Sequence, residues 1–303
     1  MTDFHKFYGT HSFITHPHQF GSQFDMLPND IASLCKVAQG WVYHYFADEQ
    51  FFGFHPPAER MPEIDNRYVN DILTRLTQMD SQPIGINRAP DKRVLGCCRD
   101  FSVLFTSILR QKGKIARTRS GFASYIIPDH YMDHVIVEVW DETANRWIQV
   151  DPEMPVGVFP FDVQDMPTDK FILAGRAWQM CREGLANPDL FGLGPDGPED
   201  VKGWSFIQTR LLQDVAALNK QEMLCWDEWG TLDGIKNEAD ATFLDKVASL
   251  TLAGNDALPE LWALTQSDER LRVPSVIQSF SPAYPFEQLP IAVQLPQEMV
   301  MAR

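Results

Sequence analysis

Basic residues are scarce in this chain. Its 303 residues include 26 lysines and arginines against 41 aspartates and glutamates, which gives a formal net charge of −15. A surface of this sign repels the phosphates of nucleic acids, and no run of lysine or arginine is long enough to overcome that repulsion. We therefore expect no nucleic-acid partner. The charge does not identify a substrate, because an acidic surface mainly keeps a protein dissolved.

Long apolar runs are also lacking. No stretch approaches the roughly 18 uninterrupted apolar residues of a membrane helix. The first residues, MTDFHKFYGTHSF, do not contain the charged region and apolar region of a secretory leader. We therefore expect a cytoplasmic protein with no membrane partner.

The five cysteines follow no disulfide or metal-binding pattern. Their number is odd, Cys97 and Cys98 are adjacent, and no CxxC pair occurs. A disulfide framework and a zinc ribbon are therefore poor explanations, and free thiols in a reducing cytoplasm fit better. The histidines near the amino terminus are irregularly spaced and lack cysteine partners. We expect neither a metal nor a cofactor.

The hydrophobic pattern predicts an α+β fold. Helices are expected where apolar residues recur at helical spacing, strands where they alternate, and loops or an irregular arm where proline, glycine and polar residues gather. The predicted helices cover residues 31–46, 67–79, 98–112, 171–184, 205–224 and 241–252, the strands 115–127, 134–140 and 146–151, the loops 51–66 and 81–97, and the arm the first 25 residues. A buried helix followed by antiparallel strands is an α+β pattern.

The character of the chain changes near residue 155. Residues 1–154 are expected to form a core of helices and an antiparallel sheet. Residues 155–303 are expected to form a mainly helical region, either a second domain or a part of the same one.

Cys98 begins the most strongly periodic of the predicted helices. The free N–H groups and the dipole at a helix start favour a thiolate by about 0.3–1 kcal/mol. A hundred- to thousandfold increase in acidity takes about 3–4 kcal/mol. A nearby base must supply the remainder, usually as an ion pair with imidazolium. Cys98 is therefore a candidate nucleophile that requires a histidine.

His134 and Asp151 are the candidate partners. His134 opens one predicted strand and Asp151 closes the next, with the turn DETAN between them. Such a hairpin brings the start of the first strand beside the end of the second. Asp151 can then accept an imidazole N–H and fix the tautomer of His134. The spacing thus predicts a Cys98–His134–Asp151 triad.

These segments resemble the transglutaminase-like superfamily. GCCRDFSVLFTSILRQKGKIAR (96–117) resembles its nucleophile helix, DHVIVEVW (133–140) its histidine strand, and RWIQVDPEM (146–154) its Trp-strand-Asp-Pro segment. GRAWQMC (175–181) and ALNKQEMLCWDEWG (217–230) look similar to the downstream part of uncharacterised bacterial members. The resemblance implies a papain-like α+β fold and acyl transfer through a thioester on Cys98.

The resemblance also assigns the neighbours of the nucleophile. Its Cys-Arg-Asp step selects Cys98 and leaves Cys97 as a packed or semi-exposed thiol, because one helical residue rotates a side chain by about 100°. The backbone N–H of Cys98 is one expected oxyanion donor. Gln39 is the candidate for the second donor, with Trp41 as the alternative.

The sequence supports two classes of function. The first is an enzyme that hydrolyses or transfers the acyl group of a peptide or small amide, with an amine as the acceptor in the transfer case. The second is a binding or scaffold protein that keeps the fold without catalysis. The expected acyl pocket is walled by Trp41 and by three aromatic residues of the helical region: Trp204, Trp226 and Trp229.

Overall fold

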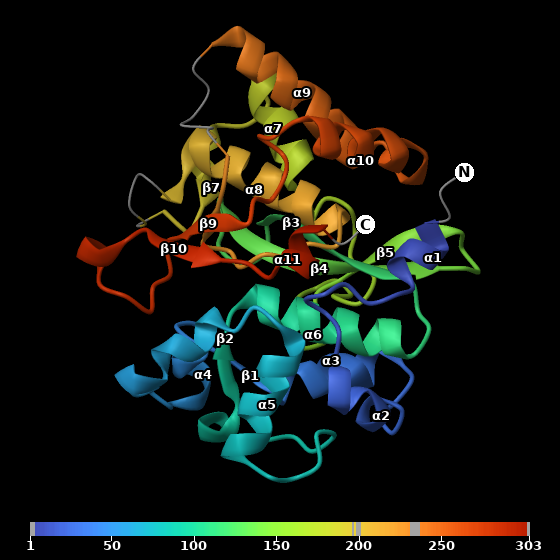
Figure 1. Cartoon of the computed structure of the whole chain (residues 1–303), viewed down its shortest axis with the longest axis vertical. Helices are drawn as coiled ribbons and strands as arrows, with labels where there is room; N and C mark the ends of the chain where they lie inside the picture. The colour runs from blue at the N-terminus through green and yellow to red at the C-terminus, as the bar shows by residue number, and fades with distance from the viewer. Residues whose placement is uncertain (1–3, 196, 198–200, 231–236, 302–303) are drawn as a thin grey trace.

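The computed structural model describes residues 4–195, 197, 201–230 and 237–301 (Figure 1). Its centre is a sheet in the order β5–β4–β3–β6, in which every neighbouring pair is antiparallel, and a short fifth strand, β7, pairs in parallel with β4. The strands are β3 (Ala116–Ala123), β4 (Tyr131–Asp141), β5 (Arg146–Val150), β6 (Phe171–Leu173) and β7 (Phe191–Gly192).

Helices cover both faces of this sheet. On one face lies α6 (Cys98–Gln111), backed by α3 (Ile31–Gln39) and α5 (Val69–Met79). On the other face lie α8 (Gly203–Leu218) and α7 (Ala174–Arg182), with α9 (Glu238–Leu252) and α10 (Leu258–Ser267) outside them (Figure 1). The predicted fold class, α+β with the helix that begins at Cys98 packed on an antiparallel sheet and further helices after it, is confirmed.

Local interactions fix the start and the end of α6. The backbone N–H of Cys97 donates to Asp100 Oδ2 at 2.8 Å, which caps the first turn of the helix. Every residue from Cys98 to Arg110 is buried, because helices and sheet enclose α6. Gly113 follows with φ of +75°, a left-handed conformation that glycine adopts without a Cβ clash.

Glycine also allows β6 to approach β3. Gly121 pairs with His134 on β4 and with Leu173 on β6. A Cβ at residue 121 would lie 2.3 Å from the carbonyl oxygen of Ile172. The strand that faces His134 therefore needs a residue without a side chain at this point.

The predicted helix over residues 31–46 is too long. α3 ends at Gln39, and Val42–His44 form β1, which pairs in parallel with β2 (Val94–Gly96) inside a predicted loop. Gly40 ends the helix, and a Cβ there would lie 2.7 Å from Asn87 Oδ1. Val42 and Tyr43 have side chains that favour strands. The apolar spacing of this stretch fits a helix, but tertiary pairing overrides it.

Two other predicted helices include three or more residues that are not helical in the structure. Phe171–Leu173 is strand β6, so the helix expected over 171–184 begins at Ala174. α8 ends at Leu218 and not at residue 224, because Lys220 adopts a left-handed backbone with φ of +61°.

The amino-terminal segment is packed and contains regular structure, which corrects the expectation of an irregular arm. Residues Phe4–Tyr8 form α1, and the buried hydroxyl of Tyr8 donates to the carbonyl oxygen of Leu218 at 2.8 Å. Other elements include α2 (Gly21–Phe24), α4 (Glu49–Phe52), a 3-10 segment (Ala58–Asp65), α11 (Gln297–Met301) and a small sheet of β8 (Asp227–Glu228), β9 (Val276–Ser279) and β10 (Ile291–Gln294).

One apolar core receives side chains from both sides of residue 155. It includes Leu104 of α6, Val137 of β4 and Leu211 of α8. The division into 1–154 and 155–303 remains a prediction. Across the described part of the chain, no helix combines the length and the apolar character needed to cross a bilayer.

Candidate active site

Cys98 is the first residue of α6. It lies close to His134, which is near the beginning of β4. Its side chain is buried, with 7% exposure. The Sγ atom of Cys98, a ring nitrogen of His134 and a carboxylate oxygen of Glu153 all lie within 4.8 Å of one another. The fold therefore brings a thiol, an imidazole and a carboxyl group to one point.

Asp151 holds the imidazole of His134. Its Oδ2 lies 2.8 Å from His134 Nε2, which leaves Nδ1 as the ring nitrogen available to the thiol. Tyr125 donates its hydroxyl to the same oxygen at 2.5 Å. The other oxygen, Oδ1, accepts the backbone N–H groups of Glu153 at 3.0 Å and Met154 at 3.3 Å. Asp151 thus orients His134 and also fixes the chain that follows it.

The charges around His134 favour the imidazolium ion. Burial alone would disfavour a charge on the ring. The charge and the hydrogen bond of Asp151 outweigh this effect, with smaller contributions from Glu153 and Asp133, and raise the pKa of His134 to about 9. Burial likewise opposes a charge on Asp151, but His134 and Tyr125 hold its pKa below the ordinary value.

Glu153 was not singled out from the sequence. Its Oε2 is buried and has no hydrogen-bond partner among the described residues. Burial raises the pKa of Glu153 to about 8, and the nearby charge of Asp151 adds to the effect while His134 opposes it. The register offers a signal: Val137 pairs with Val150, so continuing the hairpin puts residue 153 opposite His134.

A second group of side chains surrounds the sulfur of Cys98. Cys97, Cys98 and Cys225 place their Sγ atoms within 4.8 Å of one another, and the Cys97 and Cys225 sulfurs are 3.9 Å apart. Hydrogen bonds from the other two thiols lower the pKa of Cys225 well below its usual value. Hydrogen bonding to Cys225 and to Cys97, together with burial, raises the pKa of Cys98 well above its usual value. The hydrogen bonds among the three thiols thus favour a thiolate at Cys225 over one at Cys98.

Side chains of α8 hold the segment that carries Cys225. Arg210 donates to the carbonyl oxygen of Cys225 at 2.6 Å and forms two bonds to Asp133, at 2.5 and 2.7 Å. Gln213 donates to the carbonyl oxygens of Cys225 at 3.2 Å and of Asp227 at 3.0 Å. Arg210 therefore connects Cys225 to the residue before His134.

Both candidate oxyanion donors are engaged with backbone carbonyls. Gln39 donates its side-chain amide to Pro152 O at 3.0 Å and to Met154 O at 3.4 Å, and the indole of Trp41 donates to Ile84 O. An oxyanion role for Gln39 or Trp41 remains a prediction that requires these bonds to break. In the structure, Gln39 holds the residues on either side of Glu153.

The three tryptophans lie in different surroundings. Trp226 packs against the Cys97, Cys98 and Val135 cluster and donates its indole N–H to Asp65 Oδ1 at 2.9 Å. Trp204 packs edge-on against Trp178, with ring centroids 5.2 Å apart. Of the three, only Trp226 lies beside Cys98.

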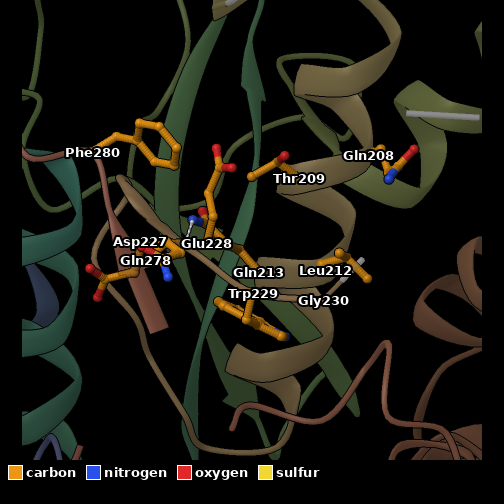
Figure 2. A pocket seen from close by; sticks show the side chains of 10 residues that line it. All are labelled: Gln208, Thr209, Leu212, Gln213, Asp227, Glu228, Trp229, Gly230, Gln278 and Phe280. Atoms are coloured by element: carbon orange, nitrogen blue, oxygen red, sulfur yellow. Dashed lines mark hydrogen bonds between the residues drawn. The ribbon is translucent and has the colours of Figure 1, made fainter. Parts of the chain in front are cut away.

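Trp229 lines a separate pocket of about 210 Å³ between α8 and the small sheet (Figure 2). Cys98, His134 and Asp151 are not among the described residues that line it: Gln208, Thr209, Leu212, Gln213, Asp227, Glu228, Trp229, Gly230, Gln278 and Phe280.

Two clusters around Cys98 consist of residue types that bind metal ions. Cys97, Cys98 and Cys225 form one, and Cys98, His134 and Glu153 form the other. Each supplies three ligands, whereas structural zinc sites use four. The expectation that the protein holds no metal remains a prediction.

Comparison with known proteins supports the sequence resemblance. Residues 53–152 match the family model described as the transglutaminase-like superfamily. No curated protein matches the chain. Among solved structures, the chain is similar to a proposed cysteine protease from Cytophaga hutchinsonii, with 14% identity and a TM-score of 0.31 over 55% of this chain. The match spans 45% of that protein, less than half of its length. Residues 53–152, about a third of the chain, are therefore similar to the transglutaminase-like superfamily.

Proposed function

We propose that the protein is a thiol-dependent acyl-transfer enzyme with Cys98 as nucleophile, His134 as acid and base, and Asp151 as the residue that orients His134. The observation that carries this proposal is the group of Cys98 Sγ, a His134 ring nitrogen and a Glu153 oxygen within 4.8 Å, with Asp151 bonded to the far side of the imidazole at 2.8 Å. A buried thiol beside an oriented imidazole is the arrangement that nucleophilic acyl transfer requires.

The first step is attack by Cys98 on an amide or ester carbonyl. The pKa of Cys225 is lowered and that of Cys98 is raised, so a thiolate at Cys98 forms when its proton passes to the Cys225 thiolate, since the raised pKa of His134 keeps that ring protonated. The imidazolium of His134 then stabilises the sulfur and later gives its proton to the leaving group. Departure of the leaving group completes acylation and leaves a thioester on Cys98, which deacylation then removes.

Two donors are available for the oxyanion of the tetrahedral intermediate. The backbone N–H of Cys98 belongs to the first turn of α6, where N–H groups lack intrahelical acceptors. The second proposed donor is the neutral carboxyl group of Glu153, which is protonated below its pKa of about 8. A buried neutral carboxyl can donate a hydrogen bond to an oxyanion.

The acyl group would then be released to water or to an amine. We propose a peptide or a small amide as the acyl donor and hydrolysis as the main outcome, with transfer to an amine as the alternative. Both outcomes use the same acyl-enzyme and differ in how well the second site excludes water. The five free cysteines fit a reducing compartment, which supports a cytoplasmic location.

The competing function is a binding or scaffold protein that keeps the fold without catalysis. Arg210, Asp133, Tyr125 and Asp151 are all buried or half-buried groups that stabilise the fold whether or not the thiol reacts. This reading predicts that Cys98 reacts no faster than the other cysteines.

The test is acylation by a small activated ester. Purified protein is mixed with p-nitrophenyl acetate, and the intact mass and the modified peptide are measured. We expect one acetyl group, on Cys98, that is absent in Cys98→Ala and unchanged in the control Cys181→Ala, since Cys181 lies apart on α7. Slow and equal modification of all cysteines would favour the scaffold protein.

A further inference from the structure

Cys225 is the one sulfur of the three-thiol group that comes from a distant part of the chain. Cys97 and Cys98 belong to the start of α6, whereas Cys225 follows α8. The acyl-transfer steps proposed above form no bond between the substrate and the sulfur of Cys225. Its sulfur nevertheless lies within 4.8 Å of the proposed nucleophile. The proposed acyl transfer therefore does not explain why the Cys225 thiol lies beside Cys98.

Geometry limits which of these thiols can form a disulfide. Adjacent residues have Cα atoms about 3.8 Å apart, which is shorter than the usual separation of about 4.4–6.8 Å across a disulfide. A bond between Cys97 and Cys98 is therefore unfavourable. An ordinary disulfide within this group must include Cys225.

Exposure and charge make Cys225 the thiol that an oxidant meets first. Cys225 is half-buried, whereas Cys97 and Cys98 are 5% and 7% exposed. Hydrogen bonds from the other thiols, and the charges of Arg210 and Arg99, lower the pKa of Cys225. A partly exposed thiolate beside cationic groups is the form of cysteine that peroxides oxidise.

Of the two possible partners, Cys98 lies beside the imidazole. A His134 ring nitrogen and a Glu153 oxygen lie within 4.8 Å of Cys98 Sγ. The imidazolium form of His134 stabilises the negative charge that develops on the Cys98 sulfur as this thiol attacks an oxidised sulfur and its proton leaves with the sulfenic oxygen.

We propose that Cys225 is a peroxide-sensing thiol that forms a reversible disulfide with Cys98. In the first step, the Cys225 thiolate attacks a peroxide: a sulfur–oxygen bond forms, the oxygen–oxygen bond breaks, and Cys225 becomes a sulfenic acid. The second oxygen leaves as hydroxide, or as an alkoxide from an alkyl peroxide, and takes up a proton from the solvent. The sulfur loses two electrons to the peroxide. In the second step, the Cys98 sulfur attacks Cys225, the sulfur–sulfur bond forms, and the sulfenic oxygen leaves as water with the proton of Cys98.

The disulfide would occupy the sulfur that the proposed function uses as nucleophile. Oxidation would therefore stop acylation and would also protect Cys98 from irreversible oxidation. A thiol reductant restores both groups by thiol–disulfide exchange. This consequence rests on the proposed function, but the cross-link itself does not.

The experiment follows the thiols and not the reaction. The reduced full-length chain is treated with hydrogen peroxide, and alkylation of Cys98 by iodoacetamide is measured before and after dithiothreitol. Peptides are mapped by mass spectrometry without reduction. We expect loss of most Cys98 alkylation, a Cys98–Cys225 cross-linked peptide, and near-complete recovery after dithiothreitol.

Variants distinguish the role of Cys225, which reacts with the peroxide, from that of Cys98, which forms the disulfide. In Cys225→Ser, the same dose should leave Cys98 alkylation nearly unchanged, and in Cys98→Ala, a sulfenic acid should be trapped on Cys225 by dimedone. Cys181→Ser, a buried cysteine of α7, should behave as the unmodified chain does. Cys225→Ala provides the same test if the serine variant fails to fold.

Three results would overturn the inference. They are a Cys97–Cys225 cross-link with Cys98 free, direct oxidation of Cys98 in Cys225→Ser at the same dose, or no cross-link at all. A cross-link in a protein that p-nitrophenyl acetate does not acylate would reject the proposed function and leave the inference standing. Acylation of Cys98 without a cross-link would reject the inference and leave the proposed function standing.

Discussion

At the scale of single residues, Glu153 is the proposed oxyanion donor, and its role can be tested by substitution. Its carboxyl oxygen lies within 4.8 Å of the Cys98 sulfur, and its Oε2 is buried without a partner in the described structure. Gln39 and Asp151 hold the backbone on either side of it. Its chemistry depends on whether it is neutral or charged.

We expect Glu153→Ala to slow acetylation of Cys98 by p-nitrophenyl acetate about 100-fold or more, the usual effect of losing one oxyanion donor. Alkylation by iodoacetamide forms no oxyanion and should change much less. Glu153→Gln keeps a donor of the same shape and should retain most of the acetylation rate. Equal losses in both reactions would instead indicate a role in forming the thiolate.

The pH dependence follows from the raised pKa of Glu153, about 8. The carboxyl is neutral below this pKa and ionised above it, so the donor is lost as pH rises through about 8. Acetylation of the unchanged chain should therefore fall, relative to alkylation, above this pH. In Glu153→Gln the ratio of the two rates should stay constant over the same range.

Removal of the Cys225 thiol should change the acidity of Cys98. Hydrogen bonding with Cys225 is the largest cause of the raised pKa of Cys98. In Cys225→Ala, the pH midpoint of Cys98 alkylation should move to a lower value, because the competing thiolate is gone. A midpoint that stays the same or rises would show that the Cys225 thiol does not raise the pKa of Cys98.

At the scale of secondary-structure elements, Gly121 links the histidine strand to β6. A side chain there would collide with the backbone of Ile172 and with the ring of Phe171. We expect Gly121→Ala to lower the free energy of unfolding by about 1–3 kcal/mol, as overpacking does. Urea unfolding followed by circular dichroism measures this change.

Gly85→Ala is the matched control for this substitution. A Cβ at residue 85 meets only Leu27 Cδ2, at 3.3 Å, and a side chain can move where a backbone cannot. Equal destabilisation by the two alanines would contradict the importance of the β3–β6 approach.

The elements also show what the sequence could predict. The His134–Asp151 contact follows from two alternating strands and one short turn, which are local features. The parallel pairing of β1 with β2 joins residues about fifty positions apart, and no local pattern reveals it. Glu153 was within reach of the hairpin register, whereas the approach of Cys225 to Cys98 depends on how α8 packs on the sheet.

At the scale of the whole molecule, a buried ion pair joins the amino-terminal segment, α6 and the turn after α8. Arg110 donates to Glu222 Oε1 at 2.9 Å, Ser12 donates to Glu222 Oε2 at 2.8 Å, and Arg110 also bonds Thr15. Three segments from different parts of the chain thus meet at one charged pair inside the protein.

We expect Glu222→Ala to cost about 3–5 kcal/mol of the free energy of unfolding, because it leaves Arg110 buried without its charge partner. Urea denaturation measures the loss. The control is Glu260→Ala, which removes the 3.0 Å pair with Lys246, whose two side chains are 55% and 59% exposed. Exposed pairs contribute about 0–1 kcal/mol, so similar losses in the two variants would be inconsistent with this account.

The position of β6 has a consequence for any shortened form of the protein. β6 lies beyond residue 155, yet it covers the outer side of β3. A fragment that ended at residue 154 would contain the whole family match and would keep the pairing of β3 with β4, but it would leave the opposite edge of β3, at Gly121–Ala123, without the strand that covers it. Such uncovered sheet edges recruit strands from other molecules. The excised family segment should therefore self-associate and form aggregates, although it carries Cys98, His134 and Asp151.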